Sequence, residues 1–326
     1  MMPSFEYVRA NSVDEGIKHL SSRNAKVHAG GTDLLGCMRD RIFPVERIVS
    51  IRGIKELSRI DETLENISIG SLTTITQLTT SPVIGRLFPG LAAAAGEVAS
   101  PQLRNQGTIG GNLCQKPRCW YYRGEFDCMR KGGMTCYAVA GENKYHCILG
   151  GDNCFMVHPS DTAPMLIALG ASLVVKGPKG TRRIAVENLY VSPSNDPQRE
   201  TVLESGEIIT EIVIPKTSER HYSSYRKVRA RQSWDFALAG IALALQFDGR
   251  RVLRARVMLS GAAPVPWRSK EVEEVITGRS LDRATIAKAV SVVMKQSKPL
   301  AQNGYKISLF EAAMKEELER TANRTS

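Results

Sequence analysis

Apolar residues recur with two different periods along the first half of the chain, and these periods predict its secondary structure. In "NSVDEGIKHLSS", Val13, Ile17 and Leu20 fall on one face of a helix, and Ser12 and Glu15 have capping-box spacing. Short β-branched runs predict strands in "AKVHAG", in "VERIVSI" (45–51) and at the start of "ENISIGSLTTITQL" (65–78). Helices are expected to start in "TTITQLTTSPVI" and to occupy "LFPGLAAAAGEVAS" (87–100). Strands that alternate with short helices favour an α+β arrangement over a long doubly wound sheet.

The pattern in the second half predicts a further unit behind a polar connection. We expect a helix over 161–171, a hairpin over 172–186 and a strand over 207–215, followed by a polar interdomain linker at "KTSERHYSS" (216–224). Two long apolar runs around Asp248-Gly249 predict another hairpin. Helices are expected after it, at 269–276, 281–296 and 307–321.

Composition and charge narrow the possible classes of protein. With 326 residues, 42% hydrophobic and 24% charged, the chain has globular composition and room for two domains. No run of about 18 apolar residues predicts membrane insertion, and the polar N-terminus lacks the pattern of a secretory signal. The net charge of +11 indicates either a basic surface or a site for a phosphate-bearing ligand or acidic partner. Nucleic acid is disfavoured because no helix-turn-helix or finger pattern accompanies the scattered basic residues.

Two glycine-rich segments offer backbone to a ligand. Gly30-Gly31 follows a predicted strand and precedes Thr32 and Asp33, and "NQGTIGGNLCQ" (105–115) repeats the combination of glycine and threonine. Glycine lets main-chain N–H groups approach an anion without a Cβ in the way. Neither segment is a Walker loop or a dinucleotide fingerprint. A plain turn is as good an explanation of each alone, whereas together they suit a long ligand with two phosphates.

Four motifs in order give the chain a specific resemblance. "AGGTDLL", "RNQGTIGGNLCQ", "HPSDTAPMLIALGA" and "YRKVRARQSWDFALAGIAL" resemble the FAD-binding (medium) subunit of molybdenum hydroxylases, over nearly the whole length. The resemblance implies an α+β fold with an FAD-binding domain of the p-cresol methylhydroxylase and vanillyl-alcohol oxidase type over residues 1–216. Its subdomains would cover about 1–56 and 57–216, and a small α+β domain of the CO dehydrogenase flavoprotein type would cover 221–326.

The resemblance also implies a set of FAD-binding residues. The first glycine loop would wrap the pyrophosphate, the second would form the opposite wall, Asp161 would bind ribityl or ribose hydroxyls, Ile209 would pack on the isoalloxazine, and Lys227 would lie near its carbonyl end. The implied set is Lys26, Val27, His28, Ala29, Gly30, Gly31, Thr32, Asp33, Leu34, Leu35, Thr108, Gly111, Asn112, Asp161, Ile209 and Lys227.

Several of these residues have simpler explanations. Asp161 is placed to cap the helix at 161–171, and Lys227 lies in a basic stretch that suits a solvated face. Animal xanthine oxidase-like chains place an aromatic residue near the adenine, where this chain has Val98, so the resemblance implies no stacking there.

Six of the seven cysteines lie between Cys114 and Cys154, and Cys37 stands apart. Without a secretion signal, such crowding favours a metal centre over disulfides. No close C-x₂₋₄-C pair supports zinc, and spacing alone does not choose four iron–sulfur ligands from six cysteines.

The resemblance does choose among the six cysteines. 4-Hydroxybenzoyl-CoA reductase and some bacterial aldehyde oxidoreductases carry a [4Fe–4S] insertion at this place, here about 116–156. The matching motifs select Cys119, Cys128, Cys136 and Cys154 as ligands, and leave Cys114 and Cys147 as packed residues. Trp120, Tyr121 and Tyr122 would shield the cluster or face a partner. Arg118, Arg123, Arg130 and Lys131 either raise its reduction potential or serve solubility.

The predicted function is electron transfer. The chain would carry FAD and a [4Fe–4S] cluster between a [2Fe–2S] subunit, itself served by a molybdopterin subunit, and an external carrier such as ferredoxin, NAD or oxygen. The cytoplasm is the expected location, with periplasmic co-export as an alternative. The rival hypotheses are a standalone flavin oxidoreductase of the same fold and a basic, zinc-stapled binding module.

Overall fold

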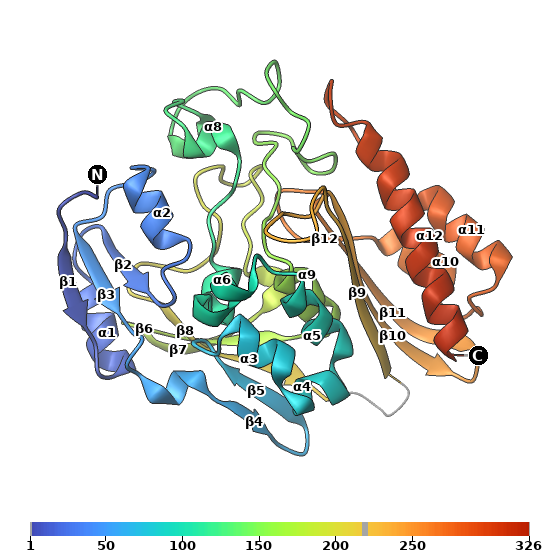
Figure 1. Ribbon diagram of the computed structural model, residues 1–326, viewed down its shortest axis with the longest axis horizontal. Helices are drawn as coiled ribbons and strands as arrows, with labels where there is room; N and C mark the ends of the chain where they lie inside the picture. Colours follow the sequence, from blue (N-terminus) through green and yellow to red (C-terminus); the bar gives the residue numbers. More distant parts are fainter. Residues whose placement is uncertain (1, 217–220, 326) are drawn as a thin grey trace.

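The computed structural model describes residues 2–216 and 221–325, and three β-sheets organise them (Figure 1). The N-terminal sheet is parallel, in the order β1-β3-β2, because helices connect its strands. It consists of β1 (Glu6–Arg9), α1 (Val13–Leu20), β2 (Ala25–His28), α2 (Leu34–Arg39) and β3 (Arg47–Ser50). Val13 and Leu20 of α1 pack with Val49 and Ile51, as the apolar spacing predicts.

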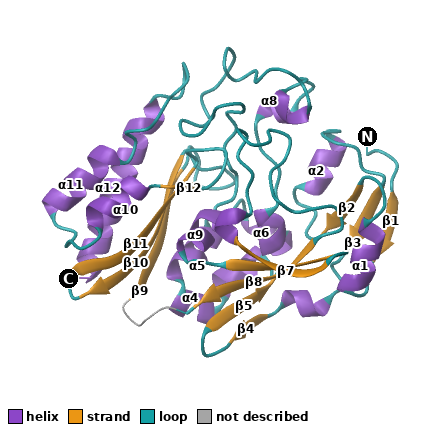
Figure 2. Cartoon of the chain, turned by 180° about the vertical axis from the view of Figure 1, so that it is seen from behind, coloured by secondary structure: helices purple, strands orange, loops and turns teal. Residues whose placement is uncertain are grey.

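The central sheet has five strands in the order β4-β5-β8-β6-β7. Its strands are β4 (Ile60–Glu62), β5 (Asn66–Gly70), β6 (Ser172–Gly177), β7 (Gly180–Ala185) and β8 (Ile208–Pro215). Short helices cover it, and all but the helix Pro101–Gln106 share the main core with it (Figure 2). They are α3 (Ile75–Thr80), α4 (Pro82–Leu87), α5 (Pro89–Gly96), α6 (Pro101–Gln106), α7 (Ile109–Leu113) and α9 (Thr162–Ala168), with 3-10 turns η1 (Lys55–Ser58) and η3 (Val186–Asn188).

The C-terminal sheet is antiparallel and buried on both faces. Its strands are β9 (His221–Val228), β10 (Ala239–Asp248), β11 (Arg251–Ser260) and β12 (Trp267–Arg268), and its helices are α10 (Lys270–Ile276), α11 (Arg283–Val292) and α12 (Tyr305–Thr325). Along β10, Ile241 and Leu243 pack under α10–α12, whereas Ala242 and Ala244 join the main core. This two-residue alternation explains why the sequence of β10 is continuously apolar.

The cysteine-rich segment between α7 and α9 is largely irregular. It contains α8 (Trp120–Arg123) and η2 (Met129–Lys131), and an isolated bridge between Cys128 and Thr135 flanks η2. In both overall views it lies at the same end of the molecule as α2 and the end of α12 nearest to it (Figures 1 and 2).

The predicted elements agree with the structure except at a few places. Residues 217–220 of the predicted linker lie outside the described residues, but 221–224 are wrong as linker because they begin β9, where Ser223 and Ser224 are buried. The capping box at α1 is only half formed: Ser12 accepts from the Glu15 amide, whereas the Glu15 carboxylate accepts from the Asn11 amide. Strands β1 and β4 were missed, since both are short and mostly exposed. None of the helices within 2–216 and 221–325 combines the length and hydropathy needed to cross a membrane.

Candidate functional site

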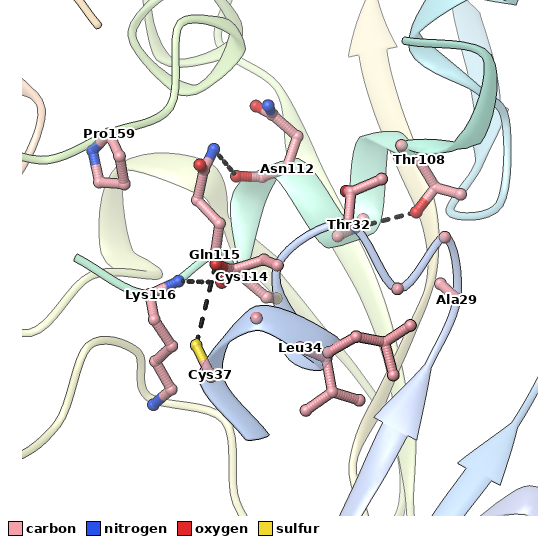
Figure 3. A pocket seen from close by; sticks show the side chains of 18 of the residues that line it. Ala29, Thr32, Leu34, Cys37, Thr108, Asn112, Cys114, Gln115, Lys116 and Pro159 are labelled. Carbon is pink, nitrogen blue, oxygen red and sulfur yellow. Dashed lines mark hydrogen bonds between the residues drawn. The ribbon is translucent and has the colours of Figure 1, made fainter. Parts of the chain in front are cut away.

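A cavity of about 760 Å³ lies where the N-terminal sheet, the second glycine loop and the segment before β10 meet. Of the sixteen residues implied to bind FAD, fourteen line it; His28 and Lys227 do not. Figure 3 shows Ala29, Thr32 and Leu34 of the first loop near Thr108 of the second, and Asn112 beyond them. The structure therefore brings together two loops that lie about 75 residues apart in sequence.

Glycine is needed at positions 30 and 31 for two different structural reasons. A Cβ on Gly30 would lie 2.0 Å from the Gln106 carbonyl oxygen, so the two loops meet backbone to backbone. Gly31 has φ +75°, a left-handed conformation that glycine adopts without strain. The pair therefore allows both the contact between loops and the turn into α2.

The first loop leaves donors free for a ligand. The amide N–H groups of Gly31, Thr32 and Asp33 have no hydrogen-bond partner among the described residues. Lys26 and Lys116 lie nearby, each with Nζ 5.5 Å from the centre of the Phe43 ring. Burial, and then the charge of Lys116, lower the pKa of Lys26, so an anion here would relieve both effects. Free amides and paired lysines fit a diphosphate.

The second loop is built partly by its own polar side chains. Thr108 Oγ1 accepts a hydrogen bond from the Gly111 amide at 3.1 Å and so caps α7. Asn112 Oδ1 accepts from Ser160 Oγ at 2.6 Å and Thr162 Oγ1 at 2.7 Å. These contacts fix the wall of the cavity beside the "HPSD" motif.

Asp161 is not a helix cap. Its carboxylate makes no capping bond to α9; it accepts from Tyr225 at 2.7 Å and from Lys227 Nζ at 2.8 Å. Ser160 Oγ instead accepts from the Ala163 amide at 3.0 Å. Lys227 is neither on a solvated face nor in the cavity wall, because its side chain is 0% exposed behind Asp161. Asp161 lines the cavity, and Lys227 acts on the cavity through it.

The sequence reasoning missed residues that complete the cavity. Ile209 and Val98 line it, and so do Trp234 and Phe236 from the loop before β10. The Trp234 amide donates to the Ala99 carbonyl at 3.1 Å. Trp234 and Ala99 have φ of 54° and 46°. These left-handed values cost energy in residues other than glycine and often occur at ligand sites. The two aromatic residues in "SWDF" are the sequence feature from which this part of the cavity wall could have been predicted.

The four cysteines selected by resemblance share one small cavity. Cys119, Cys128, Cys136 and Cys154 all line it, together with Tyr121, Tyr122, Met129, Arg130, Tyr137 and Met156. Within the described residues, no group of three or more His, Cys, Asp or Glu side chains is placed to hold a metal ion.

One thiol and one arginine of this cavity favour an anionic group. The hydrogen bond between Cys136 and Cys154 lowers the pKa of the Cys136 thiol and, with burial, raises that of Cys154, while burial raises the pKa of Cys119 to about 11. Arg130 is 4% exposed, and its Nε and Nη2 have no hydrogen-bond partner among the described residues. Buried guanidinium N–H groups are costly unless something accepts from them. Arg130 Nη1 donates to Glu200 Oε1 at 3.2 Å and to the Arg199 carbonyl at 3.3 Å, so only Nε and Nη2 remain as donors to a bound group. The four thiols and these two donors fit a tetrathiolate cluster.

The remaining cysteines lie elsewhere. Cys114 lines the large cavity, and burial raises its pKa to about 12. Cys147 is fully buried and does not line the four-cysteine cavity. Cys37 does not stand apart: it packs with Cys128 and Tyr122.

Known proteins match this architecture over almost its full length. Residues 3–217 match the FAD-binding domain of molybdopterin dehydrogenases, and residues 198–320 match the C-terminal domain of CO dehydrogenase flavoproteins. The FAD-binding subunit PaoB of aldehyde oxidoreductase from Escherichia coli (strain K12) is 33% identical over 318 residues, covering 94% of this chain and 95% of PaoB.

Carbon monoxide dehydrogenase gives the same result in sequence and structure. The medium chain from Hydrogenophaga pseudoflava is 27% identical, covering 91% of this chain and 88% of that protein. A solved structure of the enzyme from this organism has TM-score 0.77 at 26% identity, covering 97% of this chain and 96% of that one.

The fold and the matching domains thus define an FAD-binding oxidoreductase subunit. The chain belongs to the family of FAD-binding medium subunits of molybdenum hydroxylases, and its relatives include aldehyde oxidoreductase and CO dehydrogenase subunits. The descriptions of the two matching domains name FAD and a flavoprotein, and neither names an iron–sulfur cluster.

Proposed function

We propose that this chain carries FAD and a [4Fe–4S] cluster as the electron-transfer subunit of a heteromeric molybdenum hydroxylase. The proposal rests on one observation: four cysteines line one cavity together with the buried Arg130, whose Nε and Nη2 groups have no hydrogen-bond partner among the described residues. A partner molybdopterin subunit would perform the substrate chemistry, and a [2Fe–2S] subunit would exchange electrons with this chain. An external carrier such as ferredoxin, NAD or oxygen would complete the transfer.

Bound FAD supplies the conversion between one-electron and two-electron transfer. The free amides of Gly31 and Thr32 would donate to its diphosphate, with Lys26 and Lys116 as nearby countercharges. Asp161, paired with Lys227 and oriented by Tyr225, would accept from ribityl or ribose hydroxyls. Ile209 would provide an apolar contact for the ring system. Val98 lines the cavity, but it offers no aromatic surface for adenine.

The cysteine segment would hold the cluster with Cys119, Cys128, Cys136 and Cys154. Tyr121 and Tyr122 are buried in the cavity wall and would exclude water. Arg130 would donate N–H groups to the anionic cluster, which stabilises its reduced form. Of the four basic residues that flank the ligands in sequence, Arg130 alone lines the cavity as described.

We keep the proposed division into an FAD-binding part over 1–216 and a C-terminal part over 221–326. The separate packing of α10–α12 on one face of the C-terminal sheet supports it. We also retain the cytoplasm as the proposed location, with co-export to the periplasm as the alternative.

Cofactor analysis of the purified full-length chain tests the proposal. We expect FAD together with about four iron and four acid-labile sulfide per chain. Serine substitution of each proposed ligand in turn should lower the iron content, whereas Cys147→Ser, also at a buried cysteine, should retain it. Zinc in place of iron, or full iron retention in the four variants, would contradict the cluster. FAD retained without iron would leave only the flavin function.

A further inference from the structure

The carboxylate of Asp33, in the first glycine loop, is bound mainly by the start of the cysteine segment, with one longer contact of 3.9 Å from the Cys37 thiol of its own helix. Asp33 Oδ2 accepts from the Lys116 amide at 2.7 Å. Asp33 Oδ1 lies 2.7 Å from Nη1 of Arg118 and 2.7 Å from Nη2 of Arg123. Two parts of the chain separated by 83 to 90 residues therefore meet at one side chain.

Asp33 makes these contacts instead of capping its own helix. It occupies the N-cap position of α2, yet its side chain makes no capping bond there. The side chain is 17% exposed, and the free amide of the same residue lines the cavity proposed for the diphosphate. An uncompensated carboxylate at this place would repel a diphosphate, so the two guanidinium groups favour FAD by neutralising Asp33.

Arg123 connects this contact to the proposed cluster ligands. Its Nε donates to the Pro117 carbonyl at 2.7 Å and its Nη1 contacts Cys37 Sγ at 2.9 Å. Its neighbour Tyr122 packs in one apolar cluster with Cys37 and Cys128. A single turn, α8, thus contacts the FAD loop on one side and the cysteines on the other.

We propose that residues 116–123 form a clasp that holds the FAD loop only while the cluster orders the cysteine segment. Asp33 is the positioning residue through which the clasp acts, and the inference rests on the proposed cluster. Because linkage is reciprocal, a cluster that strengthens FAD binding is itself retained more firmly when FAD is bound.

The experiment measures how much the cluster contributes to FAD affinity, with and without the Asp33 charge. FAD dissociation constants are determined by flavin fluorescence on deflavinated full-length chain. We expect Cys128→Ser to raise the constant about tenfold over wild type, within the usual range of coupling between sites. In the Asp33→Asn background, adding Cys128→Ser should change the constant less than about twofold.

Two further measurements distinguish the effect of losing the cluster from misfolding of a variant and from a general structural effect. Wild-type chain freed of iron by a chelator should show the same loss of FAD affinity, without any substitution. Conversely, FAD should slow iron loss to a chelator in wild type but not in Asp33→Asn. Asp61→Asn, at an exposed carboxylate paired with Arg59 elsewhere, should keep both effects.

The outcomes separate the inference from the proposed function. If the wild-type chain binds iron but its FAD affinity does not change when the iron is removed, the clasp is overturned and the proposed function stands. Coupling that persists in Asp33→Asn would overturn the role of Asp33. Wild type that binds FAD but no iron would refute the cluster, and the clasp with it.

Discussion

Lys227 and Asp161 form a buried ion pair behind the wall of the FAD cavity. Their Nζ and Oδ2 atoms lie 2.8 Å apart, and the two side chains are 0% and 6% exposed. Lys227 also donates to the Glu97 carbonyl at 3.0 Å, and Tyr225 donates to the other carboxylate oxygen. The pair joins β9 of the C-terminal sheet to the start of α9.

Removing one partner of this pair should be strongly destabilising. Lys227→Met leaves a buried carboxylate without its cation, so the free energy of unfolding should fall by about 3–5 kcal/mol. Denaturant titration measures this fall, and the added variant Asp161→Asn should recover part of it. Lys176→Met, which removes the exposed partner of Asp14, should cost less than about 1 kcal/mol. Equal losses in the two lysine variants would contradict the burial argument.

Gly30→Ala should separate the two loops of the FAD cavity. The new Cβ would overlap the Gln106 carbonyl oxygen, and neither backbone can move without disturbing the amides beside it. We expect FAD affinity to fall at least about tenfold, which corresponds to 1.4 kcal/mol. Gly85→Ala in α4, where nothing lies within 4 Å of the new Cβ, is the matched control. An unchanged flavin content in Gly30→Ala would show that the loops are not in contact.

Arg130→Gln should lower the reduction potential of the cluster. The substitution removes a buried positive charge from the cavity wall, so adding an electron to the cluster becomes less favourable. An EPR-monitored redox titration measures the shift. Arg199→Gln removes an exposed guanidinium from a neighbouring residue whose carbonyl accepts from Arg130. A potential unaffected by Arg130→Gln in iron-replete protein would place the guanidinium away from the cluster.

Lys306 should make stability depend on pH in the alkaline range. Its ammonium donates to the carbonyls of Gly261 at 2.7 Å and His146 at 3.1 Å, and burial lowers its pKa from 10.5 to about 8. Below pH 8 both folded and unfolded chains hold the proton, and the folded chain bears the full cost of the buried charge. Between about pH 8 and 10.5 only the unfolded chain holds it, so stability rises with pH relative to a chain without this lysine.

Comparison with Lys306→Met isolates this contribution from other titrating groups. The unfolding free energy of wild type should rise relative to the variant by about 2 kcal/mol between pH 7.5 and pH 10. Parallel pH profiles for the two proteins would show that the folded chain leaves the pKa of Lys306 near its ordinary value of 10.5.

The local elements and the loops of the cavity were predictable because their signals are local. Alternating apolar residues, the Asp248-Gly249 turn and the paired glycines each specify nearby backbone, and the structure has the expected hairpin and loops. The grouping of four cysteines was not available from spacing, because an irregular segment brings them together. It followed from the family resemblance.

The pairing of charges was not predictable from the chain alone. In the sequence, Asp33 is one of the residues that the resemblance implies to bind FAD. The structure pairs its carboxylate with the distant Arg118 and Arg123. Lys227 similarly reads as one cation in a basic stretch, although its carbon chain is buried and its ammonium faces Asp161. Such choices depend on tertiary contacts, and no local propensity encodes them.

The alternation of small and large residues along β10 limits how this chain can be cut into fragments. Ala242, Ala244 and Met258 belong to the same packed interior as α5 and α9. A polypeptide starting at residue 221 would expose the apolar face of this sheet to solvent and would tend to aggregate. The recombinant unit suited to biophysical work is therefore the uncut polypeptide.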